Sequence, residues 1–91
     1  MKNILITGCG SGLGRKAAIA LANREHFVYA TTHTQEQADH LNKLNKKWCL
    51  PMHAFKLDIR NLDDRHKVRK LNLDILINNA AIGEIGRAHV W

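Results

Sequence analysis

The chain has 91 residues, 45% of them hydrophobic, and carries a formal net charge of +6. Such a length allows one small domain at most, and no apolar run is long enough for a membrane helix or a signal peptide. The two cysteines form no CxxC pair, which argues against a redox motif or a disulfide framework, so we expect a cytoplasmic protein with no membrane partner.

The chain begins with a strand-like segment, a helix-like segment and a second strand-like segment. Residues 2–7 form a short, mostly apolar run that is typical of a buried strand. Residues 13–23 carry small apolar side chains at helical spacing and predict a helix with a small-residue face. Residues 27–31 predict a second short strand.

A capping box marks the second helix. Thr34 and Gln37 form a Thr-x-x-Gln pattern, in which the side chain of each residue bonds to the backbone N–H of the other. Apolar residues follow at three-residue steps, so the helix is predicted to run from this box to about residue 47. Residues 52–57 then predict a third strand, which begins just after Pro51, where proline is tolerated.

A third helix and a fourth strand complete the pattern. Asn61 is a suitable N-cap, acidic residues occupy the turn that follows, and apolar positions continue to Leu71. Residues 73–77 predict the fourth strand. Strands that alternate with helices in this way favour a parallel sheet with right-handed crossovers and helices on both faces.

Basic residues gather near the ends of the second and third predicted helices, at residues 43–47 and 65–70. The helix dipole favours cations in a last turn, and no aromatic residues interleave with these charges as they do on nucleic-acid-binding surfaces. We therefore expect a solvated face and no nucleic-acid partner. A basic nucleic-acid-binding domain is kept as an alternative.

Four glycines lie between the first strand and the first helix, at Gly8, Gly10, Gly12 and Gly14. A helix N-terminus offers unpaired N–H groups and a partial positive charge, and glycine lets a ligand approach the backbone itself. This arrangement suits the pyrophosphate of a dinucleotide. A plain strand–helix connection is the alternative, but four glycines are more than a turn requires.

The spacing of the glycines distinguishes between known motifs. A Walker A loop would need a glycine at Leu13 or Arg15, and the common Rossmann pattern GxGxxG would need one at Leu13. The chain instead satisfies Thr-Gly-x-x-x-Gly-x-Gly, starting at Thr7. That pattern resembles the short-chain dehydrogenases/reductases.

Two further motifs carry the resemblance. Leu57-Asp58-Ile59 stands where that family has an acidic residue after its third strand. Asn78-Asn79-Ala80-Ala81 stands where it has Asn-Asn-Ala-Gly after its fourth strand, with alanine in place of the glycine. All three motifs occur in the family's order and approximate spacing, and the resemblance extends to about Gly83.

The resemblance implies an α/β fold, a Rossmann-type doubly wound parallel sheet that is truncated to a β-α-β-α-β-α-β half. It implies the cofactor-binding part of an NAD(P)-dependent oxidoreductase, which transfers hydride between a nicotinamide cofactor and a carbonyl or alcohol substrate. The implied cofactor-binding residues are Gly8, Gly10, Ser11, Gly12, Leu13, Gly14, Thr32, His33, Asp58, Ile59, Asn79 and Ala80. Ser11, Gly12 and Leu13 would hold the phosphates, Asp58 and Ile59 would contact the adenine, and Asn79 and Ala80 would line the adenosine ribose.

The end of the second predicted strand bears on the choice between NADP and NAD. Family members that prefer NAD carry an Asp or Glu there, which hydrogen-bonds the ribose hydroxyls. Here that end reads Thr31-Thr32-His33, with no carboxylate to repel a 2′-phosphate and with side chains that can donate to one. The sequence therefore favours NADP, with NAD as the alternative because no arginine is present.

Several of these residues also have purely structural interpretations. Asp58 is suited to capping a turn, and Asn78 and Asn79 are suited to tying neighbouring strand ends together. Cys9 has no general base near it in the sequence and is expected to fill space rather than to react. The six histidines show no ligand spacing, so we expect no metal site.

The family's catalytic residues are not found in this chain. Its enzymes use a Ser and a Tyr-x-x-x-Lys pair, whereas the single tyrosine, Tyr29, is followed four residues later by His33. We therefore expect residues 1–83 to be a partial dinucleotide-binding domain that is inactive alone. Residues 85–91 match one frame of a common sequencing adapter when its TGA codon is read as tryptophan, so residues 84–91 are expected to be non-native.

A second hypothesis on function stays open beside the enzyme. The same fold would suit a dinucleotide-sensing regulator that binds the cofactor without turning it over. Members of the family are often homo-oligomers, but their contacts use helices beyond this segment, so assembly does not follow from these residues.

Overall fold

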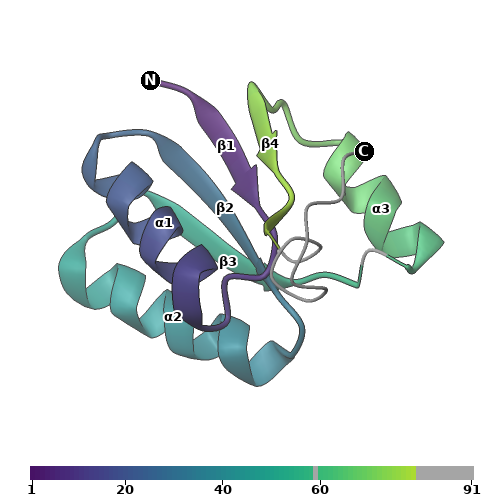
Figure 1. The fold of residues 1–91 in the computed structure, drawn as a ribbon, viewed down its shortest axis with the longest axis horizontal. Helices are drawn as coiled ribbons and strands as arrows, with labels where there is room; N and C mark the ends of the chain where they lie inside the picture. Colours follow the sequence, from purple (N-terminus) through teal and green to yellow (C-terminus); the bar gives the residue numbers. More distant parts are fainter. Residues whose placement is uncertain (59, 80–91) are drawn as a thin grey trace.

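The computed structural model of the chain describes residues 1–58 and 60–79, which alternate between strands and helices as the sequence predicts (Figure 1). The elements are β1 (Asn3–Ile6), α1 (Gly12–Asn23), β2 (Phe27–Thr32), α2 (Gln35–Trp48), β3 (Met52–Lys56), α3 (Leu62–Arg69) and β4 (Ile75–Ile77). Ile59, Ala80 and the tail at 84–91 lie outside the described residues, so the expectations for them remain predictions.

The strands form one parallel sheet with the order β3-β2-β1-β4. The chain moves outward from β1 to β3 and then returns to the other side of β1, which is the strand order of a doubly wound sheet. The predicted Rossmann-type architecture is therefore confirmed. In such sheets ligands bind beyond the carboxyl ends of the strands, at the point where the order reverses. Here that point lies between β1 and β4.

The hydrophobic core lies between the sheet and helices α1 and α2, which Figure 1 shows running along the same side of the sheet. Alternate residues of β1, β2 and β3 point into it, and two alanines of α1, Ala18 and Ala22, let that helix approach the strands closely. Leu41 of α2 is 2% exposed. Burying a leucine side chain contributes about 1.5–3 kcal/mol.

Side chains of helix α2 also form hydrogen bonds with backbone groups of the edge strand β3. The side chain of Asn42 accepts from the backbone N–H of Ala54 and donates to its carbonyl, both at 2.8 Å. The Nδ2 group of Asn45 donates to the carbonyl of Met52 at 3.2 Å. These amides pair backbone groups that would otherwise be unpaired at an edge strand.

Helix α3 packs much less tightly than the other two described helices. It stands opposite the second face of the sheet, across a cavity of about 370 Å³ whose lining includes Tyr29, Phe55, Lys67 and Leu71. None of its residues is buried, because the sequence LDDRHKVR has few apolar side chains to place against the sheet. The expectation of helices on both faces therefore holds for position but not for close packing.

Candidate cofactor site

The glycine-rich loop connects β1 to α1 at the carboxyl end of the sheet. Gly8 has a φ of 71° and Gly12 a φ of 63°, values that favour glycine. Between them, the backbone N–H of Cys9 donates to the carbonyl of Thr31 at 2.8 Å, which fastens the loop to β2. The loop is therefore anchored at its start and turned sharply at both ends.

Gly14 is required by close approach rather than by its backbone angles. A Cβ at this position would overlap the carbonyl oxygen of Gly8 and the side-chain amide of Asn79. Asn79 Nδ2 itself donates to that carbonyl at 3.2 Å. The start of α1, the loop and the end of β4 thus meet at one point, which is where the strand order reverses.

The N-terminus of α1 differs from those of the other described helices. Its N-cap residue, Ser11, makes no side-chain capping bond, and no acidic residue lies in its first turn. By contrast, Thr34 caps α2 with Glu36 in the first turn, and Asn61 caps α3 with two aspartates following. Unpaired N–H groups and the positive end of the helix dipole are therefore left open at α1.

The space above this helix start fits a phosphate group. A Cβ built on Gly12 meets no atom within 4 Å, so the backbone there faces open space. Ser11 and Leu13 on either side are exposed. A phosphate bound at this point could accept directly from backbone N–H groups, which is the interaction that a glycine loop before a helix provides.

Asn78 and Asn79 both join the end of β4 to neighbouring backbone or side chains. Thr7 Oγ1 donates to Asn78 Oδ1 at 3.0 Å, beside the bond from Asn79 to Gly8. Their predicted structural role is confirmed by these contacts. The Nδ2 group of Asn78 is buried and, among the described residues, has no hydrogen-bond partner.

Asp58 follows β3 and uses its carboxylate to shape a turn. Oδ1 accepts from the backbone N–H of Arg60 at 2.9 Å and from its Nε at 3.2 Å. These hydrogen bonds, together with the positive charges of Arg60 and His33, lower the pKa of Asp58 below its usual value. The structural interpretation of Asp58 is thus correct, while its contact with adenine stays a prediction.

The end of β2 carries the two residues predicted to face a 2′-phosphate. Thr32 is buried, and its hydroxyl donates to the carbonyl of Thr34 at 2.8 Å. His33 is exposed and lies near enough to Asp58 to contribute to lowering the pKa of its carboxyl group. In this conformation Thr32 has already used its hydroxyl hydrogen, so His33 is the freer donor of the two.

Cys9 lies inside the loop but is not poised to react. Its side chain is fully buried, and burial raises the pKa of the thiol to about 12. The thiol donates to the carbonyl of Ile6 at 3.2 Å. The expectation that Cys9 fills space rather than acting as a nucleophile is therefore confirmed.

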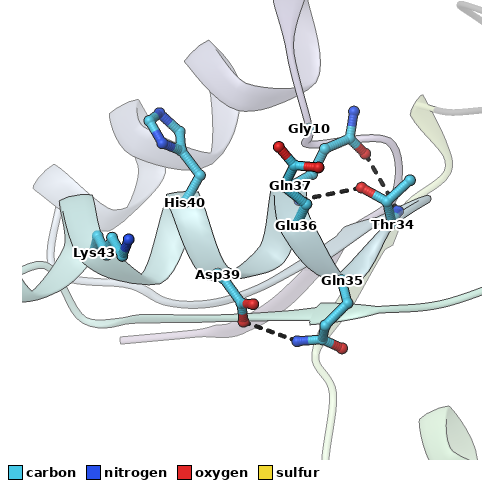
Figure 2. A pocket seen from close by; sticks show the side chains of 8 residues that line it. All are labelled: Gly10, Thr34, Gln35, Glu36, Gln37, Asp39, His40 and Lys43. Carbon is cyan, nitrogen blue, oxygen red and sulfur yellow. Dashed lines mark hydrogen bonds between the residues drawn. The ribbon is translucent and has the colours of Figure 1, made fainter.

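An open cavity of about 770 Å³ lies beside the loop, against the first turns of α2 (Figure 2). Its lining residues are Gly10, Thr34, Gln35, Glu36, Gln37, Asp39, His40 and Lys43. Sequence reasoning identified Thr34 and Gln37 only as a capping box. It missed that Gln37 lies against the glycine loop, because residues 27 positions apart meet only once α2 is seated on the sheet.

The described residues hold neither a metal-ligand cluster nor a membrane-spanning helix. Within residues 1–58 and 60–79, no three His, Cys, Asp or Glu side chains are grouped so that they could hold a metal ion. No helix within this part has the length and apolar character needed to cross a membrane.

Comparison with known proteins gives the context for this site. The sequence matches the profile of the short chain dehydrogenase family over residues 2–90. The chain belongs to this family. The resemblance carried by the glycine, aspartate and asparagine motifs is thereby confirmed.

Individual relatives of this short-chain dehydrogenase chain agree with the family match. It is 36% identical over 87 residues to the 3-oxoacyl-(acyl-carrier-protein) reductase FabG of Buchnera aphidicola subsp. Schizaphis graminum, covering 89% of this chain and 34% of that protein. It is 30% identical over 93 residues to human 17-beta-hydroxysteroid dehydrogenase type 1, covering 91% of this chain and 28% of that protein. The chain thus spans about a third of the length of these curated relatives.

Solved structures share the fold of this short-chain dehydrogenase chain. An actinorhodin polyketide ketoreductase variant crystallised with NADPH superposes with a TM-score of 0.73 at 21% identity. The match covers 86% of this chain and 32% of the ketoreductase. At that level of identity, the likeness concerns the fold alone.

Proposed function

We propose that this chain is the cofactor-binding part of an NAD(P)-dependent oxidoreductase that transfers hydride between a nicotinamide cofactor and a carbonyl or alcohol substrate. Membership of the short chain dehydrogenase family supports this, as do relatives named as a reductase and a dehydrogenase. The two cysteines are free thiols, in agreement with a cytoplasmic protein.

The open N-terminus of α1 carries the proposal. The other two described helices satisfy their first turns with capping side chains and acidic residues, whereas α1 offers only backbone N–H groups behind a glycine with open space above it. A helix start left in this state stabilises a negative ligand. The pyrophosphate of a dinucleotide matches that requirement.

The residues of the loop have distinct parts in binding. The backbone around Ser11, Gly12 and Leu13 receives the phosphates at the start of α1. Gly14 allows α1 to approach Gly8, and Asn79 holds the Gly8 carbonyl in place from β4. When bound, the nicotinamide ring supplies the hydride chemistry, while this chain binds and orients the adenosine end.

These 91 residues bind the cofactor but do not turn it over. The sequence holds no Tyr-x-x-x-Lys pair, and the ring of Tyr29 packs edge-on against Phe27 and Phe55. The dinucleotide-sensing regulator differs from the enzyme only in residues that this chain does not contain. Both functions make the same prediction for cofactor binding.

NADP is the preferred cofactor under this proposal. The end of β2, residues 31–34, carries no carboxylate to repel a 2′-phosphate, and His33 is exposed and able to donate to one. The NADPH in the ketoreductase structure of the same fold is consistent with this choice. A lower dissociation constant for NADPH than for NADH, measured by nucleotide fluorescence, is the expected result.

Ser11→Asp tests the site itself. An aspartate at this N-cap would bond to the first-turn N–H groups with its own carboxylate, so α1 should become more stable while the ligand loses its place. We expect the urea midpoint to rise. The affinity for NADPH should fall by about tenfold or more, which corresponds to a loss of about 1.4 kcal/mol of binding free energy. Asn61→Asp at the cap of α3 is the matched control, and it should leave NADPH binding unchanged.

At a ligand site, Ser11→Asp should raise stability and lower the affinity for NADPH. At an ordinary helix end, it should raise stability and leave the affinity unchanged. If Ser11→Asp leaves the affinity for NADPH unchanged, the helix start does not hold the phosphates and the proposal fails. It also fails if the unmodified chain binds neither NADPH nor NADH. Competition by 2′-phospho-AMP would place the bound ligand at the adenosine end.

A further inference from the structure

The side chain of Gln37 lies directly against the middle of the glycine loop. A Cβ built on Gly10 would come within 2.5 Å of Cδ, 2.6 Å of Oε1 and 2.7 Å of Nε2 of Gln37. All three atoms belong to the carboxamide, so this group packs against the backbone of Gly10. Figure 2 shows the two residues side by side at the start of α2.

The capping box holds this carboxamide in place. Gln37 Oε1 accepts from the backbone N–H of Thr34 at 3.4 Å, while the hydroxyl of Thr34 accepts from the N–H of Gln37 at 3.1 Å. The hydroxyl of Thr32 donates to the Thr34 carbonyl and fixes the turn between β2 and α2. The backbone of Gln37 is therefore fixed at the helix start, and one hydrogen bond holds its carboxamide beside Gly10.

Within residues 1–58 and 60–79, the hydrogen bonds that anchor the loop to neighbouring strands lie before Gly10 in the chain. Cys9 is bonded to Thr31 and the Gly8 carbonyl to Asn79, but both bonds precede Gly10 in the loop. After Gly10 come Ser11, which makes no side-chain capping bond, and then the first residue of α1. The carboxamide thus supports the segment that leads into the open helix start.

We propose that Gln37 is a positioning residue for the phosphate-binding loop: its carboxamide sets the place of Gly10 and so the direction of the first N–H groups of α1. This inference rests on the proposed function. The inference goes beyond the proposed function because Gln37 belongs to the second helix and acts on the site through Gly10. The contact also explains why residue 10 is a glycine, since Gly10 does not adopt the positive φ found at Gly8 and Gly12.

A double-mutant cycle between Gly10→Ala and Gln37→Ala tests the contact. In the unmodified background, the added methyl group meets the carboxamide and should displace the loop, weakening NADPH binding by about tenfold or more. With Gln37→Ala present, the methyl group has room, and the further loss from Gly10→Ala should be less than about threefold. Gln35→Ala is the control, because Gln35 shares the first turn and the cavity but its side chain bonds to Asp39 of the same helix.

Gln37→Glu separates positioning from stability. Glutamate keeps the capping box and suits a helix start, so the urea midpoint should stay the same or rise. The same change places a negative charge beside Gly10, so affinity for NADPH should fall several-fold and recover in part at high salt. Because glutamate has the shape of glutamine, this result tests whether the contact with Gly10 lies beside the bound phosphates, and the double-mutant cycle tests the positioning.

The outcomes separate the two proposals. If the unmodified chain binds NADPH but Gly10→Ala costs the same affinity with Gln37 or Ala at position 37, the positioning role is wrong and the proposed function stands. An unchanged affinity in Gln37→Glu would place the contact with Gly10 away from the bound phosphates, and it contradicts the positioning role as well. If the unmodified chain binds neither NADPH nor NADH, the proposed function and this inference both fail.

Discussion

The two sides of β1 differ in how completely the chain covers them. On one side, β2 and β3 are packed under α1 and α2, and Leu41 and Val28 are almost fully buried. On the other side, Ile75 and Leu76 of β4 are 42% and 50% exposed, and α3 buries none of its residues. Figure 1 shows the contrast, with α3 set apart from the sheet beyond β4.

The candidate site depends mainly on the well-packed side. The glycine loop is fastened to β2 through Cys9 and supported by Gln37 of α2. From β4, Asn79 contributes one hydrogen bond to Gly8. Regions with few buried contacts open at low cost, so α3 is expected to unfold locally while the loop keeps its shape.

The largest effect should come from removing a core side chain on the well-packed side. Leu41→Ala leaves a cavity under α2 and is expected to cost about 2–5 kcal/mol of the free energy of unfolding. Leu62→Ala in α3 is the matched change, and because Leu62 is 58% exposed it should cost about 0.5 kcal/mol or less. Urea denaturation followed by circular dichroism measures both. Equal losses would show that the two sides are packed alike.

The sequence predicted most of the fold because each element carried its own local signal. The capping box at Thr34 and Gln37, the cap at Asn61 and the short apolar runs marked the helices and strands, and the structure has them in that order. The glycine spacing, together with the aspartate and asparagine motifs, was specific enough to indicate the family. These signals depend on residues close together in the chain.

The contacts that could not be predicted join residues that are distant in the sequence. The sequence pattern did not single out Asn42, which pairs with the backbone of Ala54 at the edge of the sheet. Gln37 was assigned to its cap and not to Gly10. The sequence pattern also did not predict the loose packing of α3. A capping residue and an acidic first turn predict where a helix begins but not whether it is buried.

Helix caps on the two sides give a smaller and sharper test of the comparison. Thr34→Ala removes the cap of α2, which packs on the core, and should cost about 1 kcal/mol of the free energy of unfolding, seen as a lower urea midpoint. Asn61→Ala removes the bond from the N–H of Asp64 to the cap of α3. Because α3 contributes little to the core, the midpoint should barely change while amide exchange in α3 becomes faster. A midpoint shift as large as that of Thr34→Ala would show that α3 unfolds together with the sheet.

The smallest expected effect is a dependence on pH that arises in the segment between β3 and α3. Asp64 Oδ2 accepts from the backbone N–H of Asp58 at 2.9 Å, and this bond, together with Lys67, lowers the pKa of Asp64; hydrogen bonds from Arg60 lower that of Asp58. A carboxyl group whose pKa is lower in the folded state stabilises that state above its ordinary pKa of about 3.9, and the stabilisation is lost as the pH falls through the folded value.

Asp64→Asn should therefore lower stability near neutral pH, change it little at the acid end of the range, and so flatten the acid side of the pH profile of stability. Urea midpoints from pH 7 down to about pH 3 measure this, since that interval ends below the ordinary pKa of aspartate. Asp63→Asn is the control, because Asp63 lies in the same first turn and its replacement makes the same change in charge. If stability falls in acid to the same extent in the unmodified chain and in both variants, the turn is already open in the folded chain. The side of β1 that carries α3 would then be even less tightly packed than the structure shows.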